Sequence, residues 1–249
     1  MKRTSIILCL LIAACSLYAQ SAEQEAGNTK KNMLKLNVAA LLLKNYAVQY
    51  ERVLGRSAGV ALSFRTMPTT SLPLKNIILD LSDDDEDTKD VLDKLRLSNY
   101  AITPEFRWYV GSRGYGRGFY IAPYYRYSKF KSNNVIYDFN NNTESIRLSG
   151  KFSSHSGGLM LGAQWFLGKL ISLDWWIAGA HYGSGNGIFD GMTDHTLTPQ
   201  EQADLRESLE DTELPFGKKE VTVTANGASV KLTGGWPGFR SGLTLGFRF

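Results

Sequence analysis

Apolar and polar residues alternate with a period of two along most of the chain from residue 33 onward. Near the start of this region, Leu34, Leu36 and Val38 alternate with Lys35 and Asn37. A period of two places successive side chains on opposite faces of a β-strand. The pattern predicts eight strands, at residues 34–42, 46–53, 58–65, 100–110, 119–129, 158–166, 170–182 and 239–249.

The two faces of these strands differ in chemistry. One face is apolar and aromatic, whereas the other carries glycine, serine, threonine and a few charges of both signs. A soluble sandwich or lipocalin would carry more lysine and glutamate on its wet face. The strands are also close to the roughly 9–11 residues that cross an apolar layer at a tilt. The sequence therefore predicts an all-β fold, an eight-stranded antiparallel transmembrane β-barrel at residues 33–249 with short helices in long outer loops.

The predicted connections alternate in length. Short turns are expected at Gly55 and at residues 111–118 and 166–169, opposite long insertions at residues 67–99, 131–148 and 183–238. This arrangement is typical of outer-membrane barrels, which have short periplasmic turns. The connection at residues 43–45 is an exception because it is tight. Pro104 and Pro123 lie inside predicted strands and fit poorly unless they mark bulges.

The long insertions contain elements of their own. Residues 87–97 and 198–210 are predicted as short amphipathic helices, with Thr198 as N-cap of the second. We favour helices that fold the loops over the rim, and a lid or a partner-binding surface is the alternative. Residues 220–232, centred on Asn226 and Gly227, predict a hairpin that extends the barrel wall. Residues 183–187 lack the lysine and the following helix of a phosphate-binding loop, and we expect the flexible start of a loop.

The first nineteen residues have the pattern of a secretory signal peptide. Lys2 and Arg3 precede an apolar run, and Ala19 is a small residue at the expected cleavage site. The mature chain would begin at Gln20 with a periplasmic segment at residues 20–32. Both cysteines, Cys9 and Cys15, lie in the leader, so the mature chain would have no thiol chemistry. Residues 12–15 also resemble a lipobox, and lipidation of Cys15 is the alternative.

Composition narrows the choice of partners. Aromatic residues make up 12% of the chain, with 24 glycines and only 7 prolines, which favours many strands over disorder. The net charge of +4 falls to +2 without Lys2 and Arg3, so no nucleic-acid partner is expected. No later stretch reaches the ~18 apolar residues of a transmembrane helix. The expected partners are outer-membrane lipid and lipopolysaccharide.

Four segments resemble a known family. They read YERVLG at residues 50–55, TPEFRWY at 103–109, GFYIAP at 118–123 and GLTLGFRF at 242–249. These motifs are similar to a family of uncharacterised Bacteroidetes outer-membrane β-barrels classed as a domain of unknown function. The resemblance covers most of residues 33–249 and is weakest in the long loops. It implies an outer-membrane barrel and brings no catalytic residues.

Three histidines are the candidates for catalysis or metal binding: His155, His181 and His195. Ser154 and Ser156 flank His155 and point to the opposite strand face, so they cannot converge with it. Ser153 shares its face, without a carboxylate nearby. The histidines also lack the spacing of a zinc site. We therefore expect no enzyme, no catalytic residue, no metal and no cofactor, and interpret His155 as a strand-end residue near the outer rim.

One acidic run could bind cations weakly. It comprises Asp83, Asp84, Asp85, Glu86 and Asp87 in the first long insertion. Clustered carboxylates suit calcium, although the run lacks the glycine and the spacing of a calcium loop. Such runs are usually solvated, which is the interpretation we favour.

Strand parity predicts a set of charges inside the barrel, because eight strands leave room only for packed side chains. The predicted lumen charge network comprises Glu51, Glu105, Arg107, Arg126, Asp174 and Arg248, joined by Arg65 and Arg240. Counting from the short turns places Glu51, Arg107, Asp174 and Arg248 low, and Arg65, Arg126 and Arg240 high. Buried charges must pair, so loop carboxylates or lipopolysaccharide phosphates are expected to complete the upper arginines.

Aromatic residues mark the expected ends of the membrane crossing. The interfacial candidates are Tyr46, Trp108, Tyr125, Tyr127, Trp165 and Trp175. Phe249 closes the last alternating strand, a feature that barrel assembly machinery recognises. The sequence predicts a monomeric outer-membrane protein with a structural, adhesive or ligand-contacting role in its outer loops. A lipid-modifying enzyme and a small-solute channel are the alternatives.

Overall fold

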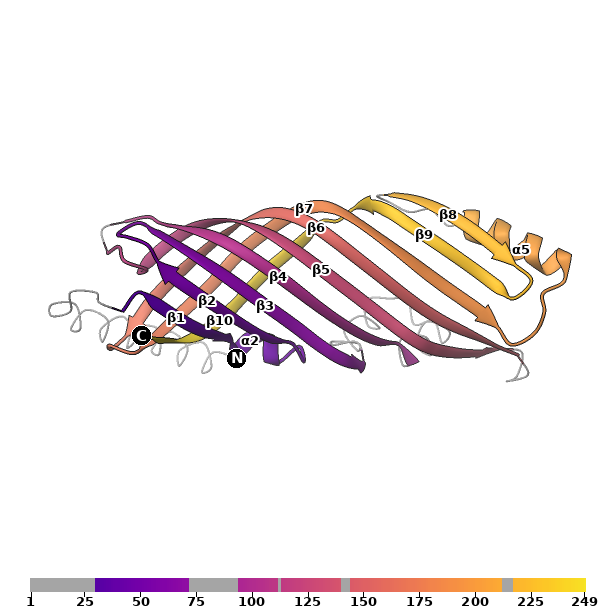
Figure 1. Ribbon diagram of the computed structural model, residues 1–249, viewed down its shortest axis with the longest axis horizontal. Helices are drawn as coiled ribbons and strands as arrows, with labels where there is room; N and C mark the ends of the chain where they lie inside the picture. Colours follow the sequence, from indigo (N-terminus) through magenta and orange to yellow (C-terminus); the bar gives the residue numbers. More distant parts are fainter. Residues whose placement is uncertain (1–29, 72–93, 112, 140–143, 212–216) are drawn as a thin grey trace, which may run out of the picture.

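Eight strands close into an antiparallel barrel in the computed structural model, which describes residues 30–71, 94–111, 113–139, 144–211 and 217–249 (Figure 1). The barrel order is β1 to β7 followed by β10, which pairs with both β7 and β1. The barrel strands are β1 (Asn32–Asn37), β2 (Tyr46–Val53), β3 (Ala58–Ser71), β4 (Arg96–Tyr109), β5 (Gly118–Phe139), β6 (Glu144–Leu167), β7 (Ile171–Thr193) and β10 (Gly238–Arg248). The predicted fold class is confirmed. No helix among the described residues is long and apolar enough to cross a membrane.

Several predicted boundaries were wrong. The first strand ends at Asn37, whose side-chain Oδ1 accepts a hydrogen bond from the Ala40 amide and caps the one-turn helix α2 (Val38–Leu41). The described parts of the expected insertion at residues 131–148 are strand, and the expected insertion at residues 183–238 begins as strand up to Thr193, because β5, β6 and β7 continue far beyond the other strands. The predicted helix at residues 87–97 lies mostly outside the described residues, and its last two residues begin β4.

The outer surface of the barrel is apolar and its interior is polar. Leu34, Val48, Leu62 and Phe106 have between 45% and 55% of their surface exposed, whereas their strand neighbours point inward and are buried. Burial alternates strictly along β2 and along most of β4. An exposed apolar surface of this extent marks an interaction site or a membrane face.

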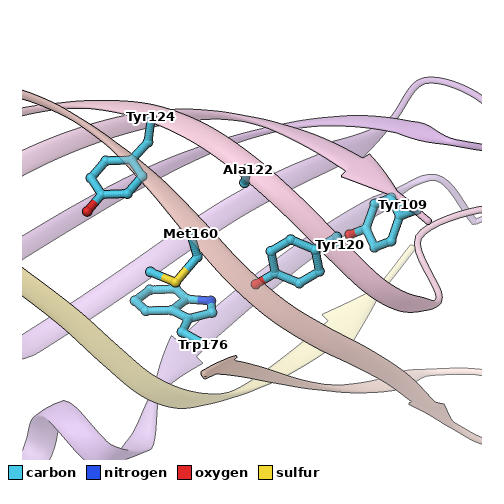
Figure 2. Packing of buried hydrophobic residues seen from close by; sticks show 6 residues of the cluster. All are labelled: Tyr109, Tyr120, Ala122, Tyr124, Met160 and Trp176. Carbon is cyan, nitrogen blue, oxygen red and sulfur yellow. The ribbon is translucent and has the colours of Figure 1, made fainter. Parts of the chain in front are cut away.

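Inward glycines make room for aromatic rings. A Cβ atom at Gly162 would lie 2.3 Å from Cζ of Tyr120, and one at Gly158 would lie 2.6 Å from Cζ of Tyr124. The rings therefore occupy the volume that the glycines leave free. Together they form the buried cluster of Tyr109, Tyr120, Ala122, Tyr124, Met160 and Trp176 inside the barrel (Figure 2).

One β-bulge changes the parity of β7. Between Trp176 and Ala178 the pairing with β6 advances one residue in β6 and two in β7, and the pairing with β10 shifts at the same place. Ile177 is therefore the extra residue, and the inward set changes from Ser172, Asp174 and Trp176 to Gly179 and His181. A bulge of this kind re-aims all the side chains that follow it.

The prolines do not mark bulges. Pro104 pairs with Leu62 and Pro123 with Leu159 in unbroken registers. The β4–β5 ladder also keeps one register, although it has no recorded pairs between Ile102 and Glu105 or between Glu105 and Trp108. Because the two prolines have no amide hydrogen to donate, the β4–β5 ladder has fewer paired residues, but its register does not shift.

The barrel wall extends beyond the barrel on one side. The hairpin of β8 (Gly217–Thr224) and β9 (Gly227–Gly235) pairs with the upper part of β7. Trp236 exchanges two backbone hydrogen bonds with Gly183, so β9 and β10 continue one ladder along β7. The predicted extension of the wall is confirmed, with the turn at Ala225 and Asn226 rather than one residue later. Figure 1 shows this extension, with helix α5 (Pro199–Asp211), at the end opposite the C-terminus.

The segment at residues 183–187 is strand, which corrects the expected flexible loop. Its glycines lie under aromatic rings: Gly187 pairs with Phe152, and a Cβ at Gly185 would lie 2.2 Å from that ring. Cross-strand aromatic rings of this kind compensate for the missing side chains of strand glycines.

Candidate functional site

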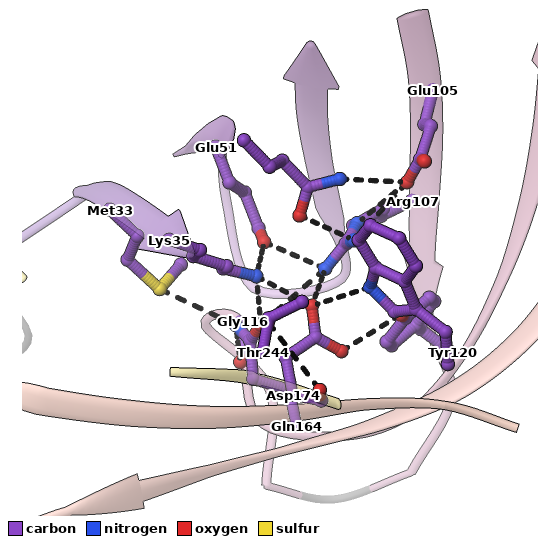
Figure 3. Close-up of polar contacts among 12 residues, drawn as sticks. Met33, Lys35, Glu51, Glu105, Arg107, Gly116, Tyr120, Gln164, Asp174 and Thr244 are labelled. Atoms are coloured by element: carbon purple, nitrogen blue, oxygen red, sulfur yellow. Dashed lines mark hydrogen bonds and ion pairs between the residues drawn. The ribbon is translucent and has the colours of Figure 1, made fainter. Parts of the chain in front are cut away.

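A buried ion cluster crosses the lower part of the barrel interior. We call Lys35, Glu51, Arg107, Gln164 and Asp174 the inner polar cluster; all five are at most 1% exposed. The Lys35 ammonium donates to Glu51, to Gln164 and, at 2.7 Å, to Asp174 Oδ2. Nη1 of Arg107 lies 2.8 Å from Glu51 Oε2 and 2.7 Å from Asp174 Oδ2 (Figure 3).

Neutral groups complete the hydrogen bonds of the inner polar cluster. The Tyr120 hydroxyl donates to Asp174 Oδ1 at 2.9 Å, and the Tyr109 hydroxyl donates to Glu51. The Gln164 amide nitrogen donates to the Gly116 carbonyl at 2.6 Å, which ties the cluster to a short turn. The Arg107 guanidinium also stacks 4.5 Å above the Tyr120 ring.

The inner polar cluster is balanced in charge. Two cations, Lys35 and Arg107, face two carboxylates, Glu51 and Asp174. Buried ions are tolerated when they are paired and their remaining donors and acceptors are satisfied. The members come from five different strands, so the cluster joins opposite walls of the barrel.

The predicted charge network is only partly brought together. Glu51, Arg107 and Asp174 meet directly, and Glu105 joins them through Nη2 of Arg107 at 3.1 Å. Arg126 lies elsewhere on the inner wall, where its Nη1 donates to Thr103 at 3.1 Å.

Arg248 is also separate from these ions. Its guanidinium lies 3.5 Å from the centre of the Phe166 ring, and its Nη1 donates to the Lys169 carbonyl. The second cation of the balanced set is Lys35, which the prediction missed. The alternation with Leu34 and Leu36 already indicated that Lys35 points inward. However, a lysine near the end of a strand can equally extend its ammonium group into solvent.

The histidines occupy three different environments. His155 lies in the middle of β6 on the outer face, not at a strand end, and its Nδ1 bonds the Tyr125 hydroxyl. His181 bonds the Tyr124 hydroxyl inside the barrel at 3.1 Å. His195 lies 3.1 Å from Asp194, and this hydrogen bond and those from Ser145 lower the pKa of Asp194.

The described part of the chain holds no group of three or more possible metal ligands. The acidic run at residues 83–87 lies outside it.

The expected interfacial aromatics lie on the outer surface. Tyr46, Trp108, Tyr125 and Trp175 are between 45% and 59% exposed, and Tyr127 and Trp165 are partly exposed. The rings of Tyr100, Tyr127 and His155 follow one another across three strands, with centroid distances of 6.0 and 5.0 Å. They form a row at one height of the barrel.

Comparison with known proteins shows the family. Residues 6–186 match the model of a family described as a protein of unknown function, DUF3575. The chain belongs to this family. The expected resemblance to a domain of unknown function is thereby confirmed, and the Bacteroidetes source stays a prediction. DUF3575 membership carries no activity with it.

Two further comparisons add little. No curated protein matches the chain. A solved structure, a major outer membrane protein from Thermus thermophilus, is similar at 13% identity, covering 89% of this chain and 100% of that chain, with a TM-score of 0.38.

Proposed function

We propose that this DUF3575 protein is a monomeric barrel of the bacterial outer membrane that contacts ligands outside the cell through its extended wall. The apolar outer surface supports the membrane location, because closed barrels satisfy all backbone hydrogen bonds in lipid. Lipid and lipopolysaccharide are the partners of that surface. The extended wall is the part that differs from a minimal barrel.

The outward side chains delimit an apolar belt. Along β5 the outward residues run from Phe119 to Tyr127, and Lys129 and Lys131 follow. Nine strand residues at a tilt span about 25 Å, the height of the apolar band of outer-membrane barrels. The row of Tyr100, Tyr127 and His155 lies at the upper edge of this belt, where amphipathic rings are favoured.

The observation that carries the proposal is an inversion of polarity above the belt. In the extended wall most outward side chains are polar, apart from Ile188 and Met192. Two pairs of them are hydrogen-bonded: Ser153 with Asn186 at 3.0 Å, and Ser229 with Asp190 at 2.7 Å. The exposed ion pair of Lys231 and Glu220 lies on the same face.

The inward side chains of the extended wall are apolar. Phe152 packs against Trp236 in a tilted arrangement with ring centroids 4.5 Å apart, and the Phe130 ring centroid lies 5.8 Å from that of Trp236. This is the opposite of the belt, where the apolar side chains point outward. A sheet that must face water on its outer side has this pattern, which supports placing β8, β9 and α5 outside the bilayer.

The interior contacts argue for a scaffold rather than a channel or an enzyme. The inner polar cluster joins opposite walls and occupies the lower interior. Ser153 bonds Asn186 and His155 bonds Tyr125, so these two residues form no nucleophile–base pair. The short turns and the C-terminus lie at the other end, which we assign to the periplasm (Figure 1).

Single-cysteine labelling of whole cells tests the proposal. A membrane-impermeant maleimide should label Asn226→Cys, in the β8–β9 turn, on intact cells. The matched variant Lys169→Cys, in the short turn between β6 and β7, should be labelled only after the outer membrane is permeabilised. Labelling of Lys169→Cys and not of Asn226→Cys on intact cells would reverse the topology and contradict the external role.

A further inference from the structure

Three arginines gather on the inner wall above the inner polar cluster. Arg65 extends from β3, Arg126 from β5 and Arg240 from β10, and we call them the upper arginine cluster. Arg126 and Arg240 are only 6% and 8% exposed, and Arg65 is partly buried. Arg65 reaches Asn99, Arg126 reaches Thr103 and Arg240 reaches Glu105, which are inward residues along the same stretch of β4. The three positive charges are therefore close enough to repel one another. Such a grouping is costly unless negative charge is nearby.

The neighbours of the upper arginine cluster are mostly neutral. Arg126 Nη1 donates to Thr103 Oγ1 at 3.1 Å, and Arg65 Nη2 donates to Asn99 Oδ1 at 3.5 Å. The Arg240 guanidinium lies 4.7 Å from the Tyr124 ring and 4.9 Å from the Trp176 ring. These contacts orient the guanidinium groups without neutralising them. His181, from β7, also faces the cluster and bonds Tyr124.

Glu105 is the one carboxylate that reaches the upper arginine cluster among the described residues. Its Oε1 accepts from Arg240 at 3.1 Å, and its Oε2 is engaged by Arg107 at the same distance. Because the inner polar cluster is already balanced, three arginines and Glu105 leave an excess of two positive charges. In addition, Arg240 Nη1 and Arg65 Nε are buried and have no hydrogen-bond partner in the described part of the chain.

We propose that Arg65, Arg126 and Arg240 bind a dianionic oxyanion, phosphate or sulfate, either free or as a group on a larger solute. Guanidinium groups present paired N–H donors that match such oxygens, which makes arginine the preferred residue for phosphate. Two negative charges equal the local excess, and the unpartnered nitrogens supply donors. The inner polar cluster lies below, so the anion enters from the end that carries the extension.

Anion-dependent stability of the folded full-length protein in detergent micelles tests this site. Inorganic phosphate is titrated against sodium chloride at constant ionic strength, and the unfolding temperature is followed. The unfolding temperature of the wild type should rise with phosphate and saturate, because a ligand that binds only the folded state stabilises it. Arg126→Gln should weaken phosphate binding by about 10-fold or more, as expected for a lost charge-assisted hydrogen bond. The control Lys151→Gln removes an exposed cation on the outer face of β6 and should leave the response unchanged.

Arg126→Gln also tests the charge balance of the site when no phosphate is bound. Without phosphate, Arg126→Gln removes a buried repulsive charge, so its unfolding temperature should equal or exceed that of the wild type. A lower value would mean that a carboxylate of this chain already neutralises the cluster, and the proposal would be wrong. Isothermal titration calorimetry of the wild type with phosphate tests binding even if the variant does not fold. If no saturable heat of binding is observed, the proposed anion site is wrong.

A second arm distinguishes the source of the anion. Micelles of diphosphorylated lipid A replace free phosphate in the same titration. Stabilisation by lipid A alone, lost in Arg126→Gln, assigns the site to lipopolysaccharide phosphates, and stabilisation by phosphate alone assigns it to a soluble anion. If Arg126→Gln binds phosphate or lipid A as tightly as the wild type does, the proposed site is wrong. None of these readouts depends on which way the extended wall faces.

Discussion

Glu51 is the residue whose loss should cost the barrel most. Its carboxylate accepts from Lys35 and from Arg107 at 2.8 Å and is fully buried. Glu51→Ala would leave the inner polar cluster with one uncompensated buried cation. We expect a loss of about 3–5 kcal/mol in the free energy of unfolding, measured by denaturant titration of the protein folded in lipid vesicles.

The matched control for Glu51 is Glu220. It pairs with Lys231 at 3.0 Å on the exposed face of the β8–β9 hairpin. Exposed pairs contribute little, so Glu220→Ala should change the free energy of unfolding by less than about 1 kcal/mol. Equal effects of the two substitutions would show that the inner polar cluster is hydrated and contributes no more than a surface pair.

Gly162 should tolerate no side chain. A Cβ there would lie 2.3 Å from the Tyr120 ring, which the hydrogen bond to Asp174 holds in place. Gly162→Ala should cost about 1–3 kcal/mol through overpacking, measured by the same unfolding titration. Gly157→Ala is the control on the same strand, since the nearest atom would be 4.0 Å away. Similar losses at both positions would point to strand propensity rather than to packing.

Ile177 is the extra residue of the bulge in β7. Deleting Ile177 would leave Trp176 opposite Gly162 and Ala178 opposite Leu161, so His181, Gly183 and Gly185 would still point inward. We therefore expect the variant to fold and to keep heat-modifiable migration on gels. Loss of this migration would show that the local twist of the bulge is required in addition to the register.

Helix α5 depends on a reciprocal cap. The Thr198 amide and hydroxyl donate to Glu201 Oε2 at 2.7 and 2.8 Å, and the Glu201 amide donates back to the Thr198 hydroxyl. The predicted N-cap at Thr198 is confirmed. Thr198→Ala should raise amide exchange in the first turn of α5 and leave β8 and β9 unchanged.

The same cap makes α5 sensitive to acid. The hydrogen bonds from Thr198 lower the pKa of Glu201. A lowered pKa in the folded state means that the stabilisation is complete above the ordinary glutamate pKa and is lost as the pH falls through the lowered value. Exchange in the first turn should therefore rise below about pH 4 in the wild type. In Glu201→Gln this pH dependence should be absent.

At the scale of the molecule, the barrel should not conduct ions. Eight strands enclose a space that side chains fill, and the inner polar cluster and the tyrosines Tyr109 and Tyr120 occupy its lower part. Planar-bilayer recordings of the wild type should show no stable, discrete openings. Regular openings would show a continuous water path and favour the channel alternative.

The number of strands, their facing and most of the interior charges could be predicted from the sequence. Each depends only on the period-two pattern, which is local. How far β5, β6 and β7 extend beyond the other strands could not be predicted from the sequence. Their upper parts are rich in serine, asparagine and glycine, and they are stabilised as strands by Phe152 and Phe189 from neighbouring strands and by Trp236 between β9 and β10. The extra residue at Ile177 was invisible for a similar reason, since a bulge is defined by its partners.

The sequence by itself determined that this chain forms a barrel, because an alternating apolar face of sufficient length has few other ways to be buried. It also determined that Glu51, Arg107 and Asp174 point inward, since parity follows from counting. Only the tertiary structure decided which charges meet. Lys35 joins the inner polar cluster and Arg248 does not, because strand register and shear, which act between strands, set the height of every inward side chain.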